Sequence, residues 1–117
     1  MSSLNHVTAS GGKLYHTNFT NDTVTCYTIT GEKVWEYNDK SVLQDTCGVT
    51  TDKDANVYVA SYGNNNIVVI SPDGKHTKRL EGTDDGLYQP HGIYLDKASN
   101  HLLVACYNGT VHMYRVS

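Results

Sequence analysis

The stretch "NVYVASYGNNNIVVISPDGK", residues 56–75, contains two short apolar runs, and each run is followed by a turn signal. The turn "YGNNN" separates the runs, and "PDG" follows the second one. β-Branched and aromatic residues between Asn- and Gly-rich breaks are typical of antiparallel strands joined by tight turns. No segment of the chain shows the 3.6-residue hydrophobic period of an amphipathic helix. The stretch therefore predicts a β-hairpin, and the fold depends on whether this hairpin recurs.

The hairpin pattern recurs along the chain. Its three copies occupy residues 13–33, 56–76 and 101–117. In the first two copies Tyr15 aligns with Tyr58, 43 residues later. The segments before the second and third copies, "CGVTTD" (47–52) and "HGIYLD" (91–96), also align, and "HVTAS" (6–10) is a weaker match. A unit of about 44 residues with four short strands is typical of a β-propeller blade.

The repeat predicts an all-β fold of about three four-stranded antiparallel blades, at residues 4–39, 45–82 and 90–117. The last blade is incomplete because the chain stops after its third strand. Three blades leave two open blade faces, whereas a closed propeller needs at least about four blades. We expect either that two chains close head to tail into a six-bladed homodimer or that the chain is the C-terminal piece of a longer propeller. Of the two we favour the homodimer.

Two segments resemble NHL repeats. They are "CGVTTDKDANVYVASYGNNNIVVISPDGK" and "HGIYLDKASNHLLVACYNGTVHMYRV", and the NHL pattern has "hGIavD" followed by "NiyVaDsgNnrI". The resemblance covers nearly the whole chain, but Asn18, Ser61 and Cys106 stand where the family usually has Asp. It implies a propeller like the C-terminal NHL domain of tripartite-motif-type proteins, which recognises protein partners. Because NHL propellers serve several functions, the expectation here is a non-catalytic binding module and not an enzyme.

The composition narrows the possible partners. The 9 basic and 12 acidic side chains give a formal charge of −3, which disfavours nucleic acid and anionic membranes. No apolar stretch is long enough to span a membrane, and the N-terminus lacks the pattern of a secretory signal. The three cysteines form no C-x-x-C pair, so no disulfide framework is indicated. We expect a cytoplasmic protein with a protein ligand, no membrane contact and no cofactor.

Aromatic residues in successive blades indicate a binding face. Tyr62 and Tyr107 fall in the turn between the second and third strands of their blades, so both should lie on one face of the propeller. Aromatic side chains repeated around a face are candidate hot spots for a partner protein, although they also pack between blades. For Trp35 we expect packing. The candidate binding residues are Tyr62, Tyr107, Asn64, Asn65, Asn108 and Tyr88.

A metal site is the basis of an alternative function. His91, Cys47 and His6 are expected near the inner ends of the first strands, which line the propeller axis, and His and Cys there could bind zinc. In the amidating lyases, whose propeller is NHL-like, channel histidines hold zinc, and His91 in "QPHGI" matches that position. Cys47 departs from it. The alternative interpretation is a metal-dependent lyase or hydrolase. The competing interpretation is that these side chains only pack near the axis.

A basic cluster supports a third possibility. Lys75, Lys78 and Arg79 lie in "KHTKR", and some NHL domains bind RNA on a basic face. The cluster is expected on the outermost strand and is followed at once by the acidic "EGTDD". These features favour a solvated blade edge. The carboxylates of Asp52 and Asp96 recur with the repeat, so we expect them to cap the turn between the first and second strands.

Overall fold

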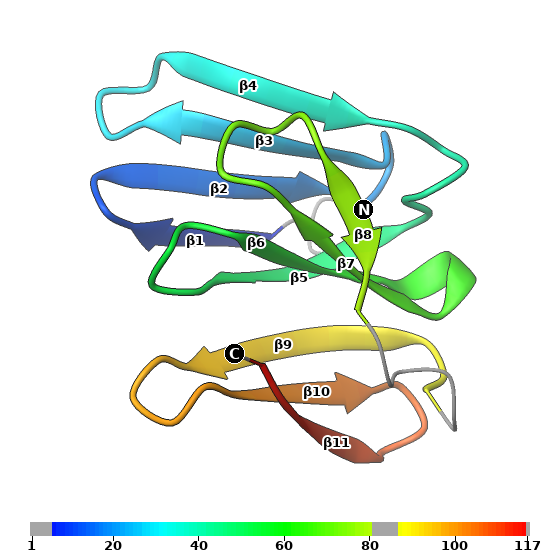
Figure 1. Ribbon diagram of the computed structural model, residues 1–117. Helices are drawn as coiled ribbons and strands as arrows, with labels where there is room; N and C mark the ends of the chain where they lie inside the picture. Colours follow the sequence, from blue (N-terminus) through cyan, green and yellow to red (C-terminus); the bar gives the residue numbers. More distant parts are fainter. Residues whose placement is uncertain (1–5, 81–86, 117) are drawn as a thin grey trace.

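The structure, a computed structural model, describes residues 6–80 and 87–116, which form three antiparallel sheets packed side by side (Figure 1). Each sheet is a meander in which strands that follow each other in sequence are paired. Antiparallel neighbours joined by short turns are what the alternation of apolar runs and Asn- or Gly-rich breaks predicts. None of the helical structure in the described ranges is long and apolar enough to cross a membrane.

The three sheets are called blades 1 to 3. Blade 1 contains β1 (His6–Ser10), β2 (Lys13–Asn18), β3 (Thr23–Thr28) and β4 (Lys33–Asn38). Blade 2 contains β5 (Thr46–Thr51), β6 (Val57–Ser61), β7 (Asn66–Ile70) and β8 (Thr77–Arg79), with the short 3-10 helix η2 (Tyr62–Asn64) between β6 and β7. Blade 3 contains β9 (Pro90–Asp96), β10 (His101–Cys106) and β11 (Val111–Arg115). The sheets of four, four and three strands confirm the all-β fold with an incomplete last blade.

Blade 2 is covered on both faces, which explains its continuous apolar runs. Successive side chains of a strand point to opposite faces of the sheet. Val57 and Val59 of β6 accordingly join the apolar cluster between blades 1 and 2, whereas Tyr58 and Ala60 join the cluster between blades 2 and 3. All four residues are buried. An alternation of apolar and polar residues is expected only where one face of a sheet is solvated, so it is absent here.

The first strand of each blade lies at the centre of the assembly and contacts the first strand of the next blade, as the placement of β1, β5 and β9 shows (Figure 1). Two hydrogen bonds join neighbouring blades near these strands. The Thr17 hydroxyl donates to the backbone oxygen of Cys47, and the Leu95 amide donates to the Thr50 hydroxyl at 3.4 Å. The outermost strands β4 and β8 carry mostly exposed residues, as their polar sequences predict.

The repeated carboxylates cap their turns as expected. Asp52 accepts from the amides of Asp54 and Asn56 at 2.9 and 3.0 Å. Asp96 accepts from the amide of Ala98 at 3.1 Å and from the Ser99 hydroxyl at 2.9 Å. These carboxylates therefore stabilise the turn between the first and second strands in blades 2 and 3.

Candidate functional site

Four rings from three blades form a continuous line, which we call the aromatic strip. Phe19 packs against Tyr62 with ring centroids 6.1 Å apart, and Tyr62 packs against Tyr107 at 5.9 Å. His91 completes the strip with an edge contact to Tyr107, also at 5.9 Å. These separations lie within the range in which aromatic pairs attract one another. The prediction that Tyr62 and Tyr107 lie on the same face of the molecule is thus supported by direct contact between their rings.

The three blades contribute equivalent residues to this strip. Phe19, Tyr62 and Tyr107 each follow immediately after the second strand of a blade, where β2, β6 and β10 end. Phe19 was not among the residues predicted from the sequence. The repeat does contain the signal, since Phe19 precedes Tyr62 by 43 residues, the spacing that also separates Tyr15 from Tyr58.

The backbone of both tyrosines is fixed by the segment that leads into their own blade. The Tyr62 amide donates to the backbone oxygen of Asp45 at 3.1 Å, and the Tyr107 amide donates to that of Gln89 at 3.0 Å. Asp45 and Gln89 both adopt left-handed backbone conformations, with φ of 56° and 49°. Such conformations are uncommon outside glycine, so their recurrence at equivalent positions indicates a shared structural requirement.

The amides of these two linker residues are also bound, by side chains of the preceding blade. Asp22 accepts a hydrogen bond from the Asp45 amide at 2.6 Å, and Asn65 accepts one from the Gln89 amide at 2.8 Å. Asp22 and Asn65 are themselves equivalent, with φ of 57° and 58°. Asp and Asn tolerate this conformation better than other side chains, and their oxygens are placed to accept locally. Each strip tyrosine is therefore positioned by a turn, a linker and the preceding blade together.

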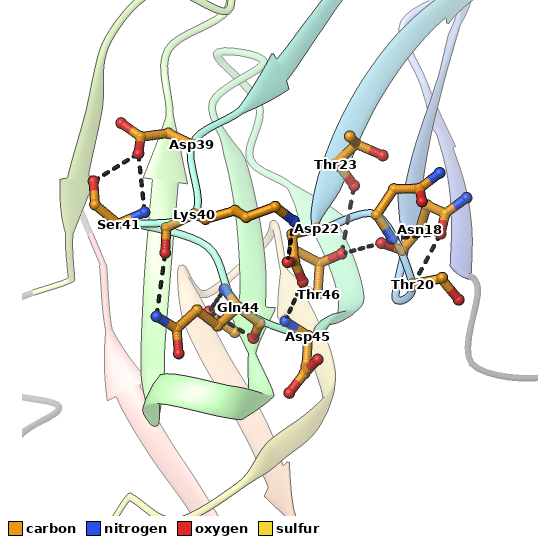
Figure 2. A network of polar contacts seen from close by, with 12 residues as sticks. Asn18, Thr20, Asp22, Thr23, Asp39, Lys40, Ser41, Gln44, Asp45 and Thr46 are labelled. Carbon is orange, nitrogen blue, oxygen red and sulfur yellow. Dashed lines mark hydrogen bonds and ion pairs between the residues drawn. The ribbon is translucent and has the colours of Figure 1, made fainter.

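Further polar contacts fix the linker between blades 1 and 2 (Figure 2). Lys40 forms an ion pair with Asp22 at 2.9 Å, and the Gln44 side chain donates to the backbone oxygen of Lys40 at 3.2 Å. The buried Thr46 hydroxyl donates to the backbone oxygen of Asn18 at 2.9 Å. Since Asn18 is the residue before Phe19, this network holds the first ring of the strip relative to blade 2.

The accessible end of the strip belongs to blade 3. Tyr107 is 69% exposed and Tyr88 is 50% exposed, whereas Phe19 and Tyr62 are partly buried against the core between blades 2 and 3. Burial raises the pKa of Tyr62, and the neighbouring Tyr107 and Tyr88 hydroxyls raise it further. Tyr88 precedes Gln89, whose backbone oxygen accepts from the Tyr107 amide, so Tyr88 and Tyr107 belong to the same region of blade 3.

The three predicted asparagines have structural partners instead. The Asn64 side chain donates to the backbone oxygen of Val42 at 3.0 Å, and Asn65 holds the linker amide described above. Asn108 accepts from the amide and hydroxyl of Thr110 at 3.2 and 2.8 Å. These contacts shape the turns that present the aromatic rings. Asn108 remains exposed beside Tyr107.

The three predicted metal ligands lie in different surroundings. Burial lowers the pKa of His6, and the electrostatic effect of His91 lowers it further. Cys47 is buried in the core between blades 2 and 3, where its thiol contacts the backbone oxygen of Asp45 at 3.5 Å. Burial, and secondarily Asp45, raises the pKa of this thiol to about 11, which disfavours the thiolate that a metal requires. In residues 6–80 and 87–116, no three His, Cys, Asp or Glu side chains group as metal ligands would.

The predicted basic residues lie along the outer edge of blade 2. Lys78 and Arg79 belong to the outer strand β8, and Lys75 is in the turn between β7 and β8, where its amide donates to Asp73 at 3.0 Å. In a meander this turn lies at the opposite end of the blade from the turn that holds Tyr62. Lys75 therefore lies at the far end of the blade from the strip, whereas Arg79 pairs with Val68, nearer the end that holds Tyr62.

Comparison with protein-family models gives no match, and comparison with curated proteins gives none either. Solved structures do match. A catalytically inactive virginiamycin B lyase from Staphylococcus aureus with quinupristin has a TM-score of 0.65 and 17% identity, over 94% of this chain and 40% of the lyase chain. The computationally designed Ika4 protein has a TM-score of 0.70 and 13% identity, over 95% of this chain and 64% of that one.

A chain of the nidogen/laminin complex has a TM-score of 0.72 and 18% identity, over 89% of this chain and 40% of that chain. At these identities the likeness concerns the fold alone. It supports a β-propeller segment made of partial propeller blades, and this chain spans only 40% of the lyase and of the nidogen/laminin chain. The chemistry and partners of those proteins do not follow for this one.

Proposed function

We propose that this chain is an NHL-type propeller segment that binds a partner protein without catalysis, through the aromatic strip and the adjacent Tyr88. One observation carries the proposal: three successive blades present an aromatic ring from the same turn, and these rings touch one another. If these rings served only to pack the blades together, the last of them, Tyr107, would not need to be exposed. Tyr107 is mostly exposed, although in blades 1 and 2 the equivalent rings are partly buried.

The chemistry of the strip fits an extended peptide with apolar, aromatic or proline side chains. Tyrosine offers a large apolar area and a polar tip, and it loses little conformational freedom on binding because it has few rotatable bonds. The hydrogen bonds from Tyr62 and Tyr107 to the linkers hold the backbone before any ligand arrives. Such preorganisation lowers the entropic cost of association.

A displayed library of random peptides, selected on the immobilised chain, tests this proposal. Peptides that bind the wild-type protein are synthesised, and their affinity is measured by fluorescence anisotropy. We expect Tyr107→Ala to weaken binding at least about tenfold, as for a hot-spot aromatic residue. Ile29→Ala is the control, because Ile29 is also 69% exposed but lies in the turn after β3, outside the strip. Equal losses in both variants, or no peptide enriched over an uncoated surface, would contradict the proposal.

A second candidate, a metal-dependent lyase or hydrolase, would use His91, which ends the strip, together with His6, with which it interacts electrostatically. The two imidazoles would supply two ligands, and a third would have to come from water or substrate. Titration of the chain with Zn²⁺ by calorimetry distinguishes this candidate. One tightly bound equivalent of Zn²⁺ that is lost in His91→Ala would support this candidate. An unchanged heat of Zn²⁺ binding in that variant would contradict it.

A further inference from the structure

Blade 3 exposes an apolar face that we call the open face of blade 3. It consists of Tyr94, Leu103, Ala105, Val111 and Met113. Tyr94, Leu103 and Met113 form one row across the sheet, because Leu103 is paired with each of the other two. Ala105 and Val111 are paired in a neighbouring row on the same face. Four of these five side chains are exposed, whereas Leu102 and Val104 on the opposite face of the same sheet are fully buried.

The same positions are covered in the other two blades. Val111 corresponds to Ile67 in blade 2, and Met113 corresponds to Val69, both at a spacing of 44 residues. Val111 is 67% exposed and Met113 is 64% exposed, whereas Ile67 and Val69 are 0% and 6% exposed. In blade 2 these positions pack against blade 3. The open face of blade 3 is therefore the face on which a further blade would pack.

Blade 1 has the complementary open face, on the side away from blade 2. Val7, His16, Thr25 and Glu36 form a row across it, as the pairing of β1 to β4 requires, and Thr25 in the middle of the row is buried. Val7 occupies the register position that Val49 has in blade 2, because the residue after each is paired with the repeat-equivalent Tyr15 or Tyr58. Val7 is 63% exposed and Val49 is 7% exposed.

We propose that the open face of blade 3 docks onto the open face of blade 1 of a second copy, and that two copies thereby close a ring of six blades. A second copy is the expected partner because the chain already contains interfaces of this kind. The chain already repeats this blade-to-blade packing twice, from blade 1 to blade 2 and from blade 2 to blade 3. If this packing is repeated once more, another blade packs on the open face of blade 3. Blade 1 of a second copy has the face that this contact needs.

The chemistry of the two faces suits a closed but reversible assembly. Val111 and Met113 supply apolar area, and exposed apolar patches of this kind mark interaction surfaces. His16, Thr25 and Glu36 make the blade 1 face more polar than the equivalent face of blade 2. Head-to-tail contacts of this kind use two different surfaces and produce a ring only when the rotation closes.

A closed ring would also surround the central hollow. The inner strands line a space of about 420 Å³, with Thr8 and Ala9 of β1 on one side and Tyr94 and Leu95 of β9 on the other. In a single chain the Lys97 side chain links the two sides, since it donates to the Ser10 hydroxyl at 3.1 Å. A second copy would complete its wall, so the assembly changes what can reach the propeller axis.

The mass of the chain in solution is the first test, measured by light scattering coupled to size exclusion over a dilution series. We expect twice the chain mass of 12.9 kDa for the wild-type protein. Met113→Asp and Val7→Asp should each give the monomer mass, because each places a charge in both junctions of the ring. Lys53→Asp, on an exposed turn of the central blade, is the control and should retain the dimer.

Mixing the two variants tests the head-to-tail arrangement. A heterodimer of Met113→Asp with Val7→Asp has one junction in which neither face is altered, so the mixture should regain the dimer mass in part. A dimer that survives Val7→Asp but not Met113→Asp would overturn the proposal in favour of blade 3 pairing with itself. A wild-type monomer at every concentration would overturn it outright. Far-UV circular dichroism confirms that the variants fold, and Val111→Lys replaces Met113→Asp if that variant does not.

This inference stands apart from the proposed peptide binding. Tyr107 and Met113 lie at different places on blade 3, one in the turn before β11 and one within β11. If the protein is a monomer that still binds peptide through Tyr107, only the proposed ring is contradicted. If it is a dimer that selects no peptide, only the proposed function is contradicted.

Discussion

The indole nitrogen of Trp35 donates a hydrogen bond to the backbone oxygen of Pro72 at 3.0 Å. Trp35 belongs to β4, the outermost strand of blade 1, and Pro72 belongs to the turn between β7 and β8 of blade 2. The ring also covers Gly74 so closely that a Cβ atom there would overlap it. The outer edge of one blade thus holds the turn of the next, and the expectation that Trp35 packs is confirmed.

Gly74→Ala should destabilise the chain more than Gly31→Ala. The two glycines are repeat-equivalent, with φ of 75° and 97°, so each alanine incurs a left-handed backbone cost of about 1–2 kcal/mol. Only the methyl group at Gly74 meets the Trp35 ring, since nothing lies within 4 Å of a Cβ at Gly31. Overpacking adds roughly 1–3 kcal/mol. Urea denaturation of both variants measures the difference, and equal losses would show that the indole moves aside freely.

Asp52→Ala should cost more stability than Asp96→Ala. Besides its two turn amides, the Asp52 carboxylate accepts from the Asn56 side chain at 3.0 Å and from the Tyr58 hydroxyl at 3.2 Å. The blade 3 equivalent of Tyr58 is Leu103, so Asp96 has no such partner there. Leaving a buried hydroxyl without its acceptor costs about 1–3 kcal/mol. Thermal unfolding of the two variants gives the comparison, and a smaller loss for Asp52→Ala would refute the assigned role.

Alkaline pH should weaken the fold through Tyr58. Burial, with a smaller effect from Asp52, raises the pKa of Tyr58 from 10.0 to about 12. Its contribution to the free energy of unfolding is therefore complete below pH 10 and is lost as the pH rises through about 12, because the unfolded chain releases the proton first. The decline between these values should be shallower in Tyr58→Phe, which has no hydroxyl to ionise. Identical slopes in urea titrations of the two proteins would contradict the shift.

Cys47 should resist alkylation while the chain is folded. Its thiol pKa rises from 9.0 to about 11, which lowers the thiolate fraction about a hundredfold at neutral pH. Burial in the core between blades 2 and 3 adds steric protection. Labelling with iodoacetamide, followed by mass spectrometry of the Cys47 peptide, should therefore be slow in buffer and fast in urea. Rapid labelling of the folded protein would indicate that this part of the core opens.

The blades themselves follow from local features of the sequence. Apolar runs of strand length, broken by Asn- and Gly-rich turns, determine where strands start and stop, as β6 and β7 show. The repeat then predicts three blades and an unfinished third one, since identical patterns fold alike. It even locates Phe19, Tyr62 and Tyr107 in equivalent turns. These properties depend on residues close in sequence, and the sequence alone determines them.

The contacts between blades were decided by the tertiary structure. No local pattern indicates that Asp22 would bind the Asp45 amide or that the Trp35 indole would bind the Pro72 backbone oxygen, because these pairs are far apart along the chain. Cys47 was predicted to face the axis together with His91, yet packing between blades 2 and 3 buries its thiol. Which face of a strand is covered depends on its neighbours. The sequence determined the repeating unit, and the packing of one unit on the next decided which side chains are buried, which are joined and which stay exposed.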